Sequence, residues 1–289
     1  HGRVPVSGRG ILRPMASWGM STTGTLHRPP RRPGLILGLL VLSQVGVACL
    51  WWRFGWQVGL PVMVATHLMV VAATLHPRAT LFCPALARLP TTERVVWLTI
   101  DDGPSDDTDA MLELLDRHRA RATFFLVGER ARAHPARVQA IRDRGHGIGN
   151  HSADHPDTRF WRLGPAAMED QIGRTQSILT AITWQTPRWY RSVVGMTNPF
   201  VGLSLKRHGL ARVAWSARGF DGVNCRPDQA LARIIRDIAP GAIVLLHEGA
   251  AHGHNVAILA QLLAWLDAEG YRTVVPDEDV QRDTSIVTA

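Results

Sequence analysis

The sequence has few cysteines, and its first 90 residues contain no acidic side chain. The three cysteines, Cys49, Cys83 and Cys225, include no C-x-x-C pair. A disulfide framework and a zinc site built from cysteines are therefore not indicated. Cysteine usage leaves the cellular compartment open.

Charge is distributed unevenly along the 289 residues. Residues 1–90 carry nine arginines, whereas the rest of the chain carries 23 basic and 24 acidic residues. The net charge of +8 therefore belongs to the N-terminal region, and the remainder is nearly neutral. A nucleic-acid-binding domain needs basic residues on the domain itself, so the composition argues against nucleic acid as a partner. Nothing in the sequence sets the oligomeric state.

Two long apolar runs follow a polar start. Residues 1–34 are rich in Gly, Pro, Ser, Thr and Arg, which predicts disorder. Residues 35–52 and 58–75 are uncharged, each near the lower length limit for crossing a bilayer, and tryptophans cluster at the break between them. We therefore predict a membrane-associated helical hairpin over residues 35–76. The alternatives are one span plus an interfacial segment, or an uncleaved signal followed by a packed helix.

Residues 94–276 show alternating strand and helix patterns, after a proline-containing linker over 77–93 and before a tail over 277–289. This alternation predicts an α/β fold with a parallel sheet. About seven strands in this length favour a small or incomplete (β/α) barrel over an open sheet. The predicted strands cover residues 95–100, 122–127, 146–151, 188–193, 211–217, 242–247 and 271–275.

The stretch LTIDDGPS, Leu98 to Ser105, places two carboxylates at the end of the first predicted strand. Adjacent strand residues point to opposite faces, but a turn at the strand end can bring Asp101 and Asp102 into one cleft. Two neighbouring anionic groups repel, so such a pair usually needs a cation or a shared proton. Considered alone, the motif could also be a solvated turn.

The other candidate residues lie at or just past the ends of later strands, where a parallel α/β fold places its site. They are His151, His155, Arg191, Asp221 and His247. His151 and His155 are spaced i, i+4, so one helical turn would put both imidazoles on one face. With an Asp from another strand end they form a two-His, one-carboxylate set, which is typical of a catalytic metal site. Taken singly, His247 could equally be a core histidine, Asp221 a turn residue and Arg191 half of a surface pair.

From about Arg94 to Pro276 the chain resembles the polysaccharide deacetylases, family 4 of the carbohydrate esterases, with the nodulation-type deacetylase domain. Five motifs occur in the order of that family: IDDGPS, HSADH, RWYRSVVG, RGFDG and LLHE. The resemblance implies a distorted (β/α) barrel that binds one divalent metal ion. Zinc is the usual ion in the family, and cobalt or another divalent ion is the alternative.

The resemblance also implies roles for the residues of the first three motifs. Asp101 is expected to be the general base, oriented by Arg191. Asp102 is expected to bind the metal beside His151 and His155.

The remaining implied roles concern the acyl group and the leaving amine. The backbone N–H of Val194 is expected to bind the oxyanion, and Leu245 to line the pocket for the acyl methyl group. Asp221 is expected to tune His247, the general acid. Two positions depart from the family, which often has Arg-Pro-Pro where this chain has Arg-Ser-Val, and His-Asp where it has His247 and Glu248. The first departure loosens the loop that holds Val194.

These residues suit a metal-dependent hydrolase that removes N-acetyl groups from amino sugars of a polysaccharide or glycoconjugate. A metal polarises the amide carbonyl and lowers the pKa of the water that attacks it. One alternative is deacylation or deformylation of a lipid-linked sugar at the membrane face, and O-deacetylation uses the same residues. An alternative of another class is an inactive carbohydrate-binding membrane protein, but binding alone requires neither Asp101 nor His247.

The arginines bear on membrane topology. Arg28, Arg31 and Arg32 precede the first apolar run and only Arg53 lies between the runs, so the positive-inside rule puts the N-terminus in the cytoplasm. Two crossings of a bacterial cytoplasmic membrane then return the catalytic domain to the cytoplasm, which we favour slightly. Polymer-modifying members of the family generally work outside, which requires an odd number of crossings. The side of the membrane thus stays open.

Overall fold

Strand β1 (Val95–Gly103) lies in the middle of a parallel sheet in the computed structural model, which describes residues 26–276. The sheet order is β5-β4-β3-β2-β1-β7-β6, and β8 pairs with the start of β1. Every strand pairing is parallel. The other strands are β2 (Ala122–Leu126), β3 (Gly147–Asn150), β4 (Trp189–Tyr190), β5 (Ala211–Arg212), β6 (Ala217–Arg218), β7 (Ala242–His247) and β8 (Arg272–Thr273).

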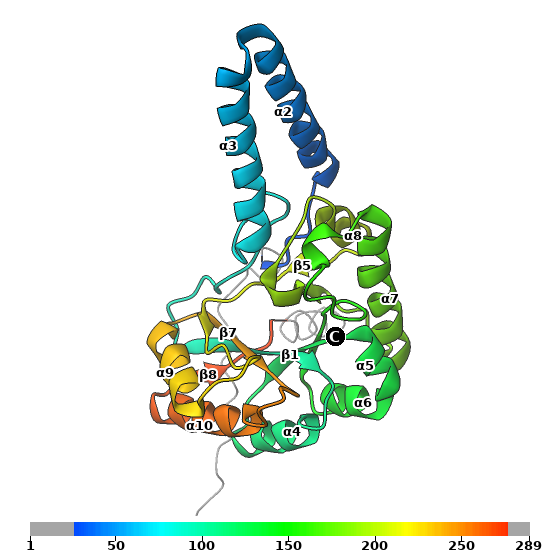
Figure 1. Cartoon of the computed structure of the whole chain (residues 1–289). Coiled ribbons are helices and arrows are strands. Elements are labelled where there is room, and N and C mark those ends of the chain that lie inside the picture. Colours follow the sequence, from blue (N-terminus) through cyan, green and yellow to red (C-terminus); the bar gives the residue numbers. More distant parts are fainter. Residues whose placement is uncertain (1–25, 277–289) are drawn as a thin grey trace, which may run out of the picture.

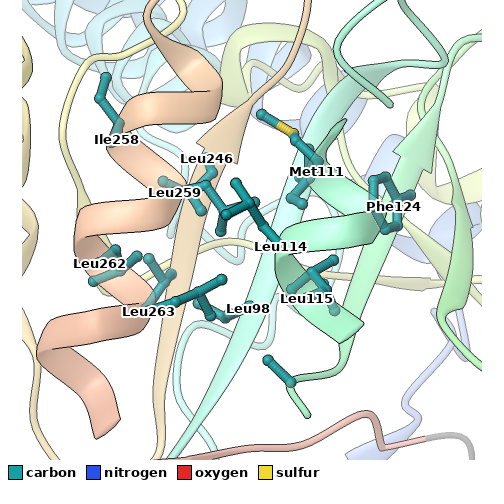
Figure 2. Packing of buried hydrophobic residues seen from close by; sticks show 14 of the residues in the cluster. Leu98, Met111, Leu114, Leu115, Phe124, Leu246, Ile258, Leu259, Leu262 and Leu263 are labelled. Atoms are coloured by element: carbon teal, nitrogen blue, oxygen red, sulfur yellow. The ribbon is translucent and has the colours of Figure 1, made fainter. Parts of the chain in front are cut away.

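Helices cover the outer face of this sheet, as the alternation predicts (Figure 1). They are α4 (Thr108–Arg117), α5 (Gly128–Ala133), α6 (Pro135–Asp143), α7 (Pro165–Thr183), α8 (Val201–Arg207), α9 (Pro227–Asp237) and α10 (Asn255–Ala268), with short 3-10 turns η1 (Phe160–Arg162) and η2 (Val193–Gly195). Leu98 and Leu246 of the central strands pack against leucines of α4 and α10 (Figure 2). Burying side chains of this size is worth roughly 1.5–3 kcal/mol each.

The opposite face of β1 points into the barrel. Trp97 belongs to an interior cluster with Phe125, Trp189 and Trp215, whereas Val96, Leu98 and Ile100 belong to the outer core. Because strand side chains alternate, Asp101 falls on the same face as Trp97. Packed aromatic side chains therefore fill the interior, and the Asp101 carboxylate lies at the carboxyl end of the inner face of β1.

The structure confirms an incomplete barrel and corrects one strand. The predicted strand over 211–217 is two short strands on opposite edges, β5 beside β4 and β6 beside β7. The chain between them crosses the opening of the barrel, where Val213 N–H donates to Tyr190 O and Ser216 N–H donates to Ile243 O. An apolar run has the same sequence pattern whether it pairs with one neighbouring strand throughout or leaves it for another. The pattern therefore could not show that residues 211–217 form two strands.

Two N-terminal segments lie against the barrel. Leu86 bridges to Val213 and Arg88 to Ala242, so residues 77–93 pack across the barrel opening and do not form a free linker. Leu26 is only 8% exposed within the interior cluster, and the His27 ring packs edge-on against Trp189. Residues 26–34 therefore differ from the predicted disorder, and the last two of them already belong to a helix. Residues 1–25 of the predicted disordered start and the tail over 277–289 lie outside the described residues.

Helices α2 (Pro33–Phe54) and α3 (Trp56–Leu75) form a hairpin that projects from the barrel (Figure 1). Gly55, at φ 80°, makes the turn, and Gly59 lets the helices approach closely at Trp51. By length and composition both helices could cross a membrane, and little of either is buried in the protein. At 1.5 Å per residue, each matches an apolar layer of about 30 Å.

Candidate functional site

The carboxyl ends of β1 and β7 lie side by side and bring two motifs together. Asp101 of β1 is paired in register with His247 of β7. The chain after β3 supplies His151 and His155, and the chain after β4 supplies Arg191. The structure thus gathers at one edge of the sheet the charged residues that the sequence places at separate strand ends.

A β-bulge resolves how two consecutive aspartates reach one site. The pairing of β1 with β2 shifts register between Asp101 and Gly103, and Asp102 has φ 72°. Such a bulge re-aims a side chain that would otherwise point to the opposite face. Asp102 Oδ1 consequently lies 3.4 Å from His151 Nε2 and 3.0 Å from His155 Nε2.

The two histidines meet through a loop, so the prediction of a helical turn is wrong. Residues 151–155 are not helical, and Ser152 and His155 have φ values of 68° and 52°. The imidazole centroids are nevertheless 5.1 Å apart. His151 Nδ1 donates to Arg191 O at 2.9 Å, because a carbonyl can only accept, and this leaves Nε2 facing Asp102.

These three residues fit a divalent cation. Their ligand atoms all lie within 4.8 Å of one another. Asp102 Oδ1 is buried and makes no hydrogen bond of acceptable geometry, although two imidazole nitrogens face it. Burial acts to raise the pKa of the Asp102 carboxyl, but both imidazoles outweigh it and hold the pKa well below its usual range. Two histidines and one carboxylate suit zinc and leave further coordination positions free.

Arg191 holds Asp101 in a buried ion pair, which excludes the surface-pair interpretation. Arg191 is fully buried, and its Nη1 donates to Asp101 Oδ1 at 2.7 Å and to Thr99 Oγ1 at 2.6 Å. Its guanidinium also lies over the Phe125 ring at 4.3 Å. Burial lowers the pKa of Arg191, and the Asp101 carboxylate partly offsets that effect. The second oxygen of Asp101 lies 3.7 Å from His151 Nε2, so the carboxylate is fixed beside the candidate metal ligands.

Asp221 contacts His247 at two of its atoms. Its Oδ2 accepts the His247 backbone N–H at 2.7 Å, and its Oδ1 lies 3.0 Å from His247 Nδ1. Burial acts to lower the pKa of His247, but the Asp221 carboxylate outweighs it and raises the pKa to about 9. His252 and Asn255 in turn donate to Asp221 O. Asp221 therefore favours the imidazolium form of His247 and contacts its Nδ1 rather than its Nε2, unlike the partners of a satisfied core histidine.

Val194 and Leu245 occupy two further positions of the site. Val194 lies in η2 at φ 45° and ψ 23°, and its side chain is 54% exposed. Leu245 is buried, on the same face of β7 as His247, and packs in the interior cluster. Val194 thus lies in the loop after β4 and Leu245 on the inner face of β7, and their predicted roles remain predictions.

Backbone strain is concentrated at this site. Among the described residues, seven non-glycine residues have positive φ, and five of them lie at the site or next to one of its residues: Asp102, Ser152, His155, Val194 and Phe220. Such conformations cost about 1–3 kcal/mol each and persist where the surroundings over-determine them. Their clustering agrees with the location of the candidate site in these loops.

Sequence reasoning missed two supporting residues. Thr99 lies two positions before Asp101 on the same strand face and accepts a hydrogen bond from Arg191. Glu248 is buried, and its Oε2 accepts from Ser105 Oγ and Thr108 Oγ1, which ties the β7 loop to the β1 loop. Burial raises the pKa of Glu248. The strand period could have revealed Thr99, whereas no local pattern indicates the long-range partners of Glu248.

Comparisons with known proteins agree on one family. A family model described as polysaccharide deacetylase matches residues 88–213. A chitooligosaccharide deacetylase from Bradyrhizobium sp. (strain ANU 289) is 35% identical over 164 residues, which cover 56% of this chain and 74% of that protein. A peptidoglycan-N-acetylglucosamine deacetylase from Bacillus cereus is 31% identical over 195 residues, or 66% of this chain and 90% of that one.

The chain also has a fold similar to that of a solved structure that is described as a pseudoenzyme. A pseudoenzyme of carbohydrate esterase family 4 from Bacillus anthracis superposes with a TM-score of 0.59 at 28% identity, covering 65% of each chain. The fold alone therefore does not secure catalysis, and the chemistry must be argued from the side chains at the site.

Proposed function

Because the chain belongs to the polysaccharide deacetylase family, an enzyme family that acts on N-acetyl groups, we propose that it deacetylates N-acetylglucosamine units of a chitin-like oligomer or of peptidoglycan. One observation carries this proposal. Asp101, held by the buried Arg191, lies beside the Asp102–His151–His155 set and in register with His247. A base, a cation site and an acid thus share one edge of the sheet.

Each residue of the site would have a separate role in the reaction. Asp102, His151 and His155 would hold a divalent ion, most simply zinc, which supplies Lewis-acid polarisation of a carbonyl and a lower pKa for water. Asp101 takes the proton of the attacking water, and the ion pair with Arg191 holds its carboxylate in place.

The acyl group and the leaving amine involve the other side of the site. The Val194 N–H stabilises the oxyanion, an interaction commonly worth about 3–4 kcal/mol, and Leu245 lines the space for the acyl methyl group. His247, kept protonated by Asp221, donates a proton to the departing nitrogen as the C–N bond breaks. The products are acetate and a free amino sugar.

Acetate release tests the proposal directly. The purified full chain should release acetate from N-acetylglucosamine oligomers or peptidoglycan, a chelator should stop the release, and added zinc or cobalt should restore it. Stoichiometric binding of these sugars without any acetate release would instead identify a carbohydrate-binding protein. Retention of both Asp101 and His247 favours the enzyme, since binding requires neither residue.

A second candidate substrate is a lipid-linked amino sugar at the membrane face. The observation that favours it is the contact between the α3 end and the site loop, where Thr197 N–H donates to Thr74 O at 3.0 Å. If the hairpin enters the membrane, the site lies near the bilayer surface. Acetate or formate release from a lipid-linked substrate exceeding that from soluble oligomers would favour this candidate.

Membrane topology yields a separate prediction. Leu26 and His27, which precede the hairpin in the sequence, pack on the barrel, and Pro77, which follows it, accepts a hydrogen bond from Arg212. Both ends of the hairpin therefore lie at the catalytic domain. If both helices cross, the two ends share one side, and the arginines before α2 place that side in the cytoplasm. Alkaline phosphatase fused after Pro90 should be inactive, whereas the same fusion at Gly55 should be active. Activity of the Pro90 fusion would contradict two crossings.

The Asp221–His247 pair predicts a pH dependence. A general acid must be protonated, so activity should fall as the pH rises through the pKa of His247, which Asp221 raises to about 9. Asp221→Asn removes the charge that raises this pKa, and the alkaline limb of the kcat profile should move down by about 1–3 pH units. The surface variant Asp237→Asn serves as the matched control. An alkaline limb unchanged by Asp221→Asn would show that His247 is not the acid.

A further inference from the structure

The end of helix α3 is bonded to the loop that carries Val194. Thr197 N–H donates to Thr74 O at 3.0 Å, and Thr197 Oγ1 donates to Ala73 O at 3.1 Å. The last carbonyls of a helix have no partner within the helix, and here a residue three positions after Val194 satisfies two of them. Thr197 itself is fully buried, so water does not compete for these bonds.

The chain after α3 adds contacts to the same loop. Gly195 has φ +76°, and a side chain there would come within 2.8 Å of Pro77 and 2.6 Å of Trp215. Arg212 Nη2 donates to Pro77 O at 2.9 Å, and Arg78 Nε donates to Trp215 O at 2.9 Å. Residues 77 and 78 are thereby bonded to Arg212 and Trp215, and Pro77 and Trp215 both lie next to Gly195 of the loop.

Apolar packing joins the hairpin and the loop from the other side. Val193 shares a buried cluster with Ala73 of α3, and Ile36, Leu40 and Val70 of the two hairpin helices pack against that cluster. On the side of Val193, the loop therefore faces the hairpin rather than solvent.

Val194 needs such support. At φ 45° and ψ 23° a β-branched residue is in an unfavourable region, and it stays there only when its surroundings fix it. Within the loop, Gly195 N–H donates to Ser192 O at 2.9 Å and Met196 N–H to Val193 O at 3.0 Å. The bonds to α3 come immediately after these, at Thr197.

We propose that the hairpin is a positioning element of the active site and that Thr197 is its clamp. Docking of α3 holds the loop so that the Val194 N–H points at the developing oxyanion. The hairpin thus supports catalysis as well as anchoring. This inference rests on the proposed deacetylase function and on the role of Val194 in it.

The variant Thr197→Val in the full chain tests the clamp. It keeps the side-chain shape and the N–H bond to Thr74 but loses the bond to Ala73 O. We expect kcat to fall by about tenfold, short of the 10²–10³-fold loss of an entire oxyanion donor, with KM nearly unchanged. Thr183→Val is the matched control, since Thr183 Oγ1 donates to Leu179 O at 2.7 Å from an equally buried place at the end of α7. Its kcat should stay within twofold of the parent.

Two further measurements separate positioning from general stability. Amide hydrogen exchange at Gly195 and Met196 should be faster in Thr197→Val and unchanged in Thr183→Val. Ser192 already has φ −73°, the value that proline imposes, so Ser192→Pro should stiffen the loop and restore much of the lost kcat in the Thr197→Val background.

The outcomes are distinguishable. A parent protein that releases no acetate from any substrate refutes the proposed function, while faster exchange in Thr197→Val still supports the clamp. An active parent with equal kcat and equal loop exchange in both threonine variants overturns the inference.

Discussion

Asp101→Asn should lose most of its turnover, by about 10²–10⁴-fold, while keeping its bound metal. The amide retains an oxygen that can accept from Arg191 Nη1, so the 2.7 Å contact and the local packing can survive. It cannot take a proton from water at neutral pH. The candidate ligands Asp102, His151 and His155 are unchanged, so metal content measured on the purified variant should equal that of the parent.

A control lies in the turn that follows β1. Asp106→Asn makes the same chemical change at a fully exposed carboxylate that pairs with Arg137 on the surface, and it should leave kcat unaltered. If Asp101→Asn turned over substrate at nearly the parent rate, the base would have to be another group. Joint loss of metal and activity in Asp101→Asn would instead make Asp101 a ligand.

His151→Ala and His155→Ala should lower metal affinity and activity together. Each removes one of the three ligand atoms that lie within 4.8 Å of one another. Loss of an outer-shell partner typically costs 10–100-fold, so removal of a ligand should cost at least about 100-fold in metal affinity. Metal content after dialysis against a weak chelator measures this independently of turnover.

His118→Ala is the matched histidine control. His118 also pairs with a carboxylate, at 2.6 Å from Asp267, but on the outer helices α4 and α10. This variant should keep full metal content and full activity. Full metal content in both His151→Ala and His155→Ala would place the cation elsewhere.

The sheet and the location of the site could be predicted from the sequence because both depend on local patterns. Buried strands such as Val95–Ile100 are recognisable by their apolar runs, and parallel strands put their ends at one edge. Asp101 and His247 each follow or end such a run, and His151 follows the short strand over 147–150. Their position at one edge of the sheet therefore follows from the parallel arrangement of the strands, whereas the order of the strands could not be derived from the pattern.

The atomic arrangement of the site could not be predicted, because it depends on loop geometry and distant partners. The i, i+4 spacing of His151 and His155 suggested a helical turn, whereas positive φ values at Ser152 and His155 bring the rings together in a loop. Nothing local to Arg191 shows that it is buried, since its partners Asp101 and Thr99 lie about 90 residues earlier in the chain.

The N-terminal segments show the same limit. Leu26 and Leu86 lie in polar or proline-containing stretches that read as disorder and linker, yet both contact the barrel. The barrel opening between β5 and β6 creates the surface on which residues 86–88 pack. That surface exists because residues 211–217 form two strands instead of one. The apolar pattern does not reveal this difference.

The central place of β1 has a consequence for the order of assembly during synthesis. Two of its neighbours, β7 and β8, are the last strands of the chain, and they flank the start of β1 on its two sides, since Val96 pairs with both Ala242 and Thr273. The barrel cannot close until nearly the whole domain has left the ribosome, because contacts so distant in sequence form late. The hairpin, which emerges first, can insert into the bilayer well before then. The barrel, which is completed later, then folds against a helix end that already exists, beside the loop that carries Val194.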